Sequence, residues 1–464
     1  MQFVSTTKHR LKLTFILIFF SGSFVMAQEN SPYSRYGLGD FFYGNHIISR
    51  GMGNISATYV DGKYNQLYQS ININNPATYS SLNILSYDLA LTVDSRTLRR
   101  ANPAAKFSSA NITPSYLALG MPLNRKKNLG FAFGIRPLSR VAYNIDQRSR
   151  VLGIDSINNH FEGSGGLNEG FIGIGKRWGG LSLGANVGYR FGNKETITEK
   201  QFISDTLFYY PSRSATNSHF GGGFINLGIQ YEKQVGSKKD KSNNTVSTII
   251  RFGAHATLSH TLNGKQDNAK ETYTVSATGT TITIDSIVKS LNIPGAINVP
   301  NTYTAGIAYV KRVTLESFGV DEQPMYELWS IAAEYNATQW SKYKNGFENS
   351  NPAFNSWQLR VGAQLMPDVY ARNYWSQVTY RAGFFTGKDY INADGKQLSL
   401  LGVSFGTAFP IRKWRSFDRQ AATIQTAFEF GKRGSNSNAY TENFFRVSVG
   451  FSLSDIWFQK RKYD

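Results

Sequence analysis

From residue 82 onward, apolar residues occupy every second position over many short stretches of the chain. One stretch places Leu181, Leu183, Ala185, Val187 and Tyr189 in alternation with Ser, Gly and Asn. A period of two is typical of β-strands, because successive side chains of a strand point to opposite faces. These stretches predict strands with one apolar face and one face that is polar or lined by glycine.

The number of such segments indicates a large all-β protein. Fourteen segments alternate in this way, at 82–94, 112–121, 128–144, 167–178, 181–192, 219–232, 247–261, 301–313, 326–339, 355–367, 375–388, 396–409, 419–432 and 442–455. Tight turns at 124–127 and 179–180 contrast with longer connections at 145–166, 193–218 and 262–300. Segment 272–288 also alternates. We expect it to be a hairpin within the longest loop. If it instead crossed the membrane, the number of barrel strands would change.

The start of the chain predicts export. Lys8, Arg10 and Lys12 precede an apolar run at 13–20, and Val25-Met26-Ala27 is a small-residue cleavage site. This is the organisation of a secretory signal peptide, which we expect at residues 1–27 and expect to be cleaved. No later stretch approaches the 18 continuous apolar residues of a membrane helix. A closed β-barrel is the other structure that can span lipid.

These observations predict a transmembrane antiparallel β-barrel of about fourteen strands at residues 82–455, followed by a basic tail at 456–464. Residues 28–81 do not alternate, but they are rich in Ile, Leu and Tyr, which argues against disorder. An ordered segment ahead of a medium-sized barrel can fill the lumen. We therefore expect an N-terminal plug at 28–81, in the outer membrane of a Gram-negative bacterium.

Composition and charge fit this interpretation. The chain has 43 Gly, 32 Phe and 26 Tyr. Aromatic residues suit the lipid-facing positions of a barrel strand, and Gly suits lumen-facing positions where space is short. The absence of Cys excludes a disulfide scaffold and thiol catalysis. The net charge of +19 falls to +16 once the three basic residues of the signal are removed. Basic residues gather in presumed periplasmic turns and in the tail, beside lipid headgroups. We therefore expect no nucleic-acid partner.

Catalytic and metal-binding motifs find no support in the sequence. The run from Gly170 to Lys176 imitates a phosphate-binding loop, but Arg177 stands where Ser or Thr is required. The six histidines show no metal-ligand or triad spacing. We expect no catalytic residues, metal or cofactor. The strand carboxylates are expected to be solvated or paired with arginines; the residues concerned are Asp88, Asp94 and Glu334, with Arg190, Arg360 and Arg381.

Several short motifs resemble the FadL-like family of outer-membrane transporters for long-chain fatty acids and other hydrophobic compounds. They are Arg50-Gly51-Met52-Gly53, then Asn75-Pro76-Ala77, Asn336 to Tyr343, and Arg360 to Ala363 with Tyr380 to Phe384. The ending from Phe444 onward resembles members from Bacteroidetes-type bacteria. The resemblance implies a plug that carries Gly51, Gly53, Asn75, Pro76 and Ala77. It also implies an opening in the wall near the third strand.

Two prolines are candidates for that lateral gate. Pro114 and Pro137 fall in the second and third segments, and proline cannot donate to a strand ladder. The alternative is that each proline sits at a strand end. The resemblance implies uptake of a hydrophobic, fatty-acid-like ligand that leaves sideways into outer-membrane lipid. The alternatives are a PorV-like, secretion-associated or interaction barrel with protein partners and, third, an outer-membrane enzyme.

Overall fold

The computed structural model describes residues 31–42, 46–62, 68–100, 103–151, 155–203, 208–278, 280–316, 325–348, 353–368, 371–393, 395–411, 421–435 and 437–455. The predicted signal peptide and basic tail lie outside these residues. Among the residues described, no helix has the length and apolar character needed to cross a membrane.

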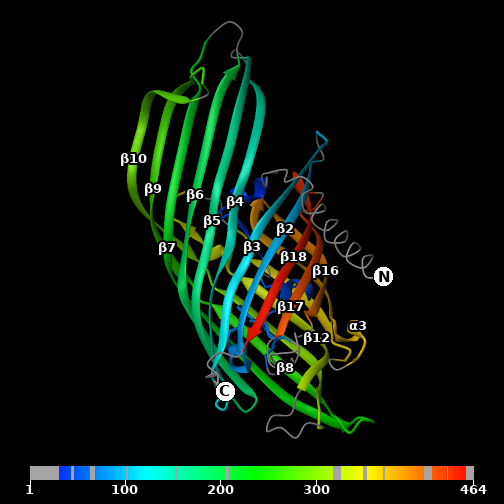
Figure 1. Cartoon of the computed structure of the whole chain (residues 1–464). Coiled ribbons are helices and arrows are strands. Elements are labelled where there is room, and N and C mark those ends of the chain that lie inside the picture. Colours follow the sequence, from blue (N-terminus) through cyan, green and yellow to red (C-terminus); the bar gives the residue numbers. More distant parts are fainter. Residues whose placement is uncertain are drawn as a thin grey trace, which may run out of the picture.

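Antiparallel strands form a closed ring, which confirms the predicted fold class (Figure 1). The ring consists, in order, of β2 (Leu85–Arg100), β3 (Ala105–Asn124), β4 (Leu129–Val151), β5 (Asp155–Trp178), β6 (Leu181–Ile203), β7 (Ser212–Lys239), β8 (Thr245–Thr257), β11 (Thr302–Thr314), β12 (Met325–Thr338), β14 (Ser356–Leu365), β15 (Thr379–Ala393), β16 (Lys396–Ile411), β17 (Ala421–Arg433) and β18 (Tyr440–Asp455). β18 pairs with β2 and closes the barrel. These are the fourteen strands that the sequence predicts.

Residues 260–299 form a hairpin above the ring rather than further ring strands. β9 (His260–Val275) pairs with β10 (Thr281–Val299), and β9 also pairs with the upper part of β7. Below the hairpin, β8 pairs directly with β11. The interpretation of 272–288 as part of a loop hairpin is therefore confirmed.

The outer parts of several strands are longer than the sequence predicts. The stretches 145–166 and 193–218, expected as loops, belong largely to β4, β5, β6 and β7. Together with β9 and β10, these strands form a tall wall on one side of the barrel (Figure 1). Polar residues occupy both faces of this wall, so the apolar alternation that marks a membrane strand is lost there. The loop prediction was wrong for that reason.

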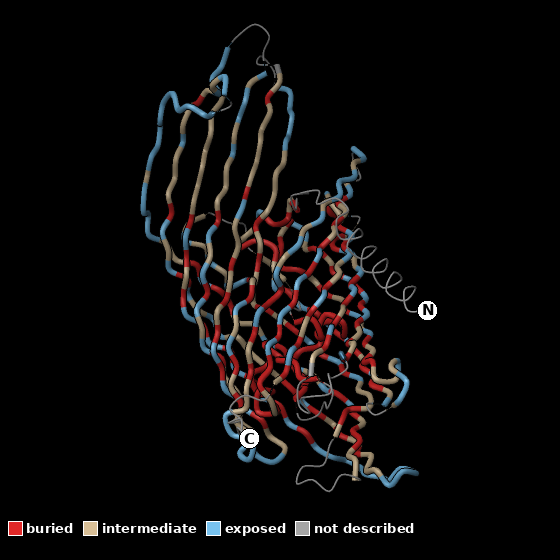
Figure 2. The backbone as a smooth tube through the Cα atoms, viewed as in Figure 1, coloured by how far each residue is buried: buried red, intermediate tan, exposed pale blue. Residues whose placement is uncertain are grey.

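The N-terminal residues lie inside the barrel. Residues 46–62 and 68–81, which we call the plug, are almost entirely buried, and the buried positions gather in the lower and middle parts of the molecule (Figure 2). The plug contains helix α2 (Ile47–Gly51) and the 3-10 helix η2 (Pro76–Ser81). α2 lies against β16 and β17, whereas η2 lies against β5 and β6.

Glycines in the barrel wall allow the plug to approach the strands closely. A Cβ atom on Gly175 or Gly184 would lie 2.4 Å from backbone atoms of Pro76. On the other side of the barrel, a Cβ atom on Gly383 would lie 2.0 Å from the backbone nitrogen of Gly53. Real Cβ atoms do not approach other atoms this closely, so these wall positions require glycine.

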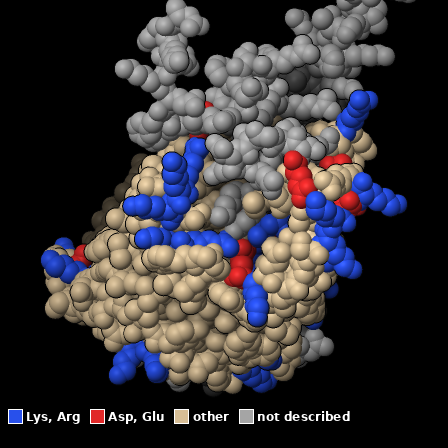
Figure 3. Space-filling model, turned by 90° about the horizontal axis from the view of Figure 1, so that it is seen from below, with Lys and Arg blue, Asp and Glu red and all other residues tan. Residues whose placement is uncertain are grey.

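The end that carries the tight turns is rich in basic side chains, and the turn Arg125–Lys127 is exposed. Figure 3 views this end and shows Lys and Arg side chains spread around the rim. Short turns are typical of the periplasmic side of such barrels. Lys233, Lys238 and Lys239 lie within β7 rather than in the turn that follows it. Arg412, Lys413 and Arg415 lie outside the described residues.

Candidate functional site

Two adjacent strands of the barrel separate halfway along their length. β3 and β4 pair only from Leu117 to Asn124 and from Leu129 to Ile135. Outside this paired part, β3 also contains residues 105–116 and β4 also contains residues 136–151. We call the interval between β3 residues 105–116 and β4 residues 136–151 the lateral slot.

The two candidate gate prolines flank the point where the strands separate. Pro114 lies opposite Leu91 beside a register shift between β2 and β3, and Pro137 lies beside a shift between β4 and β5. Such bulges bend a strand and interrupt its ladder. Both prolines are interior to their strands, so the alternative that each sits at a strand end was wrong.

A segment of the N-terminus occupies the β4 edge of the lateral slot. Residues 31–42, which we call the latch, contain η1 (Pro32–Arg35) and the short strand β1 (Asp40–Phe41). β1 pairs with Arg140 and Ser139 of β4. The N–H of Phe42 donates to the carbonyl oxygen of Leu138 (2.9 Å), and the Ser139 hydroxyl donates to the carbonyl oxygen of Leu38 (2.6 Å).

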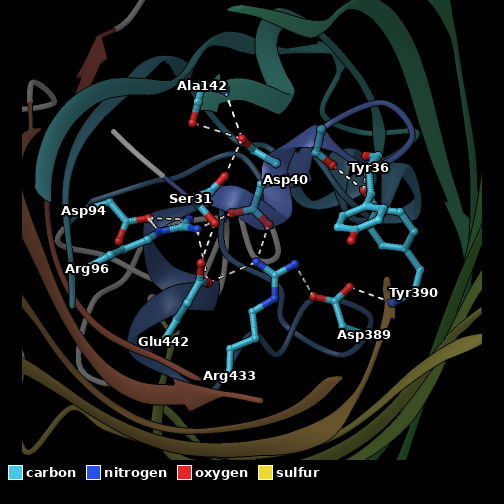
Figure 4. A network of polar contacts seen from close by, with 12 residues as sticks. Ser31, Tyr36, Asp40, Asp94, Arg96, Ala142, Asp389, Tyr390, Arg433 and Glu442 are labelled. Carbon is cyan, nitrogen blue, oxygen red and sulfur yellow. Dashed lines mark hydrogen bonds and ion pairs between the residues drawn. The ribbon is translucent and has the colours of Figure 1, made fainter. Parts of the chain in front are cut away.

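Ion pairs tie the latch to the strands across the slot. Asp40 accepts from Arg96 of β2 and from Arg433 of β17, the latter at 2.8 Å between Oδ1 and Nη1 (Figure 4). Arg96 also pairs with Asp94 (2.8 Å), and Arg433 pairs with Asp389. All of these side chains are almost fully buried. The latch thus spans the slot, with backbone contacts to β4 and charged contacts to β2 and β17.

The charge of Asp40 is stabilised by this arrangement. Burial raises the pKa of a carboxyl group, but the guanidinium groups of Arg433 and Arg96 offset that effect and hold the pKa of Asp40 below its usual range. The side chain therefore stays ionised at neutral pH, and its ion pairs hold the latch in place. Beside it, Phe41 packs against Trp340 and Tyr390, with ring centroids 5.0 and 5.7 Å away.

A cavity of about 160 Å³ lies directly behind the latch. One part of its lining is apolar and consists of Phe41, Phe42, Leu138, Val299 and Trp340. The other part is polar and includes three arginines from three strands, namely Arg136, Arg190 and Arg360. Phe41 and Phe42 belong to the latch and Leu138 to the slot edge of β4, so the cavity and the slot share a wall.

The arginines give the cavity a positive character. Arg136 and Arg190 both bind Glu169, at 2.8 and 2.7 Å. Arg360 donates to the neutral oxygens of Gln358 (2.9 Å) and Asn54 (3.1 Å). Among the described residues, no carboxylate lines the cavity itself. Glu169 lies behind Arg136 and Arg190, and Glu334 lies opposite Arg360 in register, so three guanidinium groups with two neighbouring carboxylates favour an anionic group in the cavity.

Comparison with known proteins gives the family. A family model described as BamG matches residues 10–464. The chain belongs to the BamG family. A search of curated proteins finds no match.

Solved structures similar to this BamG-family chain share its fold at low sequence identity. The toluene transporter TbuX of Ralstonia pickettii is 15% identical with a TM-score of 0.54, over 89% of this chain and 98% of that one. The toluene transporter TodX of P. putida is 16% identical with a TM-score of 0.52, over 90% and 100%. The monoaromatic hydrocarbon channel CymD is 14% identical with a TM-score of 0.50, over 91% and 100%.

These likenesses confirm the resemblance to FadL-like outer-membrane transporters. The chain therefore has that barrel fold. The Bacteroidetes-type origin stays a prediction.

The plug motifs of this BamG-family chain lie apart from each other, but their neighbours meet at the cavity. Gly51 and Gly53 pack on β16 and β15, whereas Asn75, Pro76 and Ala77 pack on β6 and β7. The residues next to these motifs, Asn54 and Asn74, both line the cavity. Asn74 accepts a hydrogen bond from Arg136 (2.6 Å).

The strand carboxylates that the sequence singles out are bound by arginines, by a tyrosine and by the plug backbone. Asp94 pairs with Arg96 and Arg446. Asp88 accepts from Tyr116 (3.0 Å), and Glu334 accepts from the plug N–H groups of Ser56 and Thr58 (both 2.8 Å). Glu334 also lies opposite Arg360 in register, so that expected pairing is retained, whereas Asp94 pairs with arginines other than the three expected. Carboxylates of the wall hold the plug, a role that strand patterns cannot reveal.

One Ser/His/Asp cluster exists in the described chain, but its geometry is structural. Nε2 of His46 lies 3.0 Å from the Ser70 hydroxyl and 3.3 Å from Asp88. A catalytic triad uses the two ring nitrogens for two different partners. Here one nitrogen meets both partners, and His46 and Asp88 are fully buried between plug and wall. The described residues also contain no group of three metal-ligating side chains.

Proposed function

We propose that this protein takes up hydrophobic small molecules with an acidic head, of the fatty-acid type, through the cavity and the lateral slot. The observation that carries the proposal is the shared wall of the two features: the cavity behind the latch borders the unpaired edge of β4. The structurally similar TbuX and TodX are named as toluene transporters, and CymD as a hydrocarbon channel.

The lining of the cavity suits an amphiphile. An anionic head would bind among the guanidinium groups of Arg136, Arg190 and Arg360. An apolar chain would lie against Phe42, Leu138 and the other apolar residues that lead to the slot. Displacement of β1 from β4 would then open a sideways path into the outer-membrane lipid. No step in this path forms or breaks a covalent bond.

A binding experiment tests the choice of substrate. Arg360→Gln should weaken binding of a fluorescent fatty acid at least tenfold and leave binding of the matched neutral alcohol unchanged. Arg381→Gln is the control, because Arg381 is also buried and faces the lumen but does not line the cavity. Equal binding of the acid by the native protein and the Arg360 variant would contradict the proposed head-group site.

A second candidate function is an interaction or secretion-associated barrel of the PorV type. The cavity is small, since drug-sized ligands occupy roughly 300–1,000 Å³. Buried ion pairs also hold the latch and plug firmly to the wall. A stoichiometric protein partner that copurifies from native membranes, together with no extractable lipid in the lumen, would favour this candidate over uptake.

A further inference from the structure

A groove of about 330 Å³ marks the lipid-facing side of the barrel, on β12, β14 and β15. Its floor is a pair of small residues, Ala363 and Ala382, that face each other across the strands. The row below is bulky and consists of Trp329, Leu365 and Tyr380, which are register partners. The groove is therefore a recess that two alanines create among larger side chains.

The lining of this groove is almost entirely apolar. Ile331 lies beside Ala363 in register, and both face away from the lumen. The next row toward the outer side contains Val361 and Phe384, which are about two-fifths exposed. In an outer-membrane barrel these side chains contact acyl chains rather than water. A recess at this place binds part of an acyl chain more closely than the flat wall around it.

Next to Trp329 at the lower end of the groove, the neighbouring strand β11 carries Tyr309 and the cation Lys311, which lie outside the groove lining. Trp329 lies opposite Lys311 in register, and its ring centroid is 5.5 Å from that of Tyr309. The Lys311 ammonium lies over the Tyr309 ring and donates to the Thr248 hydroxyl. Within the described residues, Lys311 forms no ion pair with a carboxylate. Its charge is therefore complementary to a lipid phosphate.

The groove lies near the ends of β14 and β15 that we expect on the periplasmic side, where the headgroup interface begins. Trp and Tyr side chains are typical of that interface. Below the groove, the short helix α3 (Tyr374–Gln377) projects from the wall, and its Trp375 is 62% exposed (Figure 1). The Tyr380 hydroxyl donates to the Trp375 carbonyl oxygen (3.0 Å), which joins α3 to the groove wall.

We propose that this groove binds one phospholipid of the periplasmic leaflet, with an acyl chain on Ala363 and Ala382 and its phosphate beside Lys311. Apolar contact in the recess and charge attraction at its lower end act on the same molecule. The bound lipid would form a fixed part of the surface that the barrel presents to its membrane neighbours.

Native mass spectrometry of the whole protein, released from nanodiscs of phosphatidylethanolamine and phosphatidylglycerol, tests the proposal. The native protein should retain one phospholipid. The double variant Ala363→Leu/Ala382→Leu fills the recess and should lose it. Ala333→Leu is the matched control, because Ala333 faces lipid on β12 outside the groove and should not change retention.

Lys311→Gln leaves the recess intact and should weaken retention of the lipid at least fivefold. Heat-modified migration on gels verifies that each variant is folded. Undiminished phospholipid on the folded double variant would overturn the proposal. Occupation of the groove by a neighbouring protein, seen as a cross-link to a photoreactive residue at position 382 in native membranes, would overturn it as well.

Discussion

At the residue scale, side-chain size decides where the plug can contact the wall. Gly175 and Gly184 have no Cβ atom and so leave space for Pro76, and Gly383 leaves space for Gly53 in the same way. The sequence shows glycines at alternating positions of the strands and so predicts a crowded inner face. It cannot show which part of the plug each glycine admits, since contacts between residues a hundred positions apart leave no local pattern.

Gly175→Ala should destabilise the barrel by roughly 1–3 kcal/mol, because its Cβ atom would overlap the Pro76 carbonyl oxygen. Gly170→Ala on the same strand is the control, since a Cβ atom there meets nothing within 4 Å. Urea unfolding in lipid vesicles measures both. A similar midpoint for the two variants would show that the plug does not press against β5.

The ion pairs that hold the latch could not be predicted from the sequence, whereas the two candidate gate prolines could. Pro114 and Pro137 could be recognised because proline carries its own backbone restriction. Asp40, Arg96 and Arg433 could not, because a buried ion pair between distant residues has no signature in sequence spacing. The composition of residues 28–81 indicates only that an ordered segment precedes the barrel strands.

At the element scale, strand pairing determines where the wall can open. β3 and β4 share only their lower halves, and β1 adds a short third strand on the free edge of β4. The membrane strands were predictable because lipid and lumen impose alternation. The tall outer wall of β4 to β7, β9 and β10 was not, because polar residues occupy both of its faces.

Pro137→Val should lengthen the β3–β4 ladder and slow uptake of a fluorescent fatty acid by several fold, because valine supplies the N–H that proline lacks. Pro122→Val is the control, since Pro122 lies where the two strands already pair. Uptake into intact cells measures the effect. An unchanged rate in a folded Pro137 variant would remove these prolines from the transport path.

At the scale of the whole molecule, the protein is a fourteen-stranded barrel with an N-terminal segment inside it and an unpaired interval between β3 and β4. The fold could be predicted from the alternation along the chain, whereas the cleaved signal peptide stays a prediction. The proposed path could not be predicted from the sequence, because it depends on the contact of the cavity with the latch and with the β4 edge.

The most direct test of this account is a disulfide across the slot. The native chain has no cysteine, so Phe41→Cys with Ser139→Cys introduces the sole pair, at register partners of β1 and β4. Opposed residues of antiparallel strands lie within the ~4.4–6.8 Å that a disulfide spans between Cα atoms. Each single-cysteine variant serves as the control for oxidation. If the latch must leave β4 for transport, the oxidised double variant should stop fatty-acid uptake, and reduction should restore it. Full uptake with the disulfide completely formed would contradict the account.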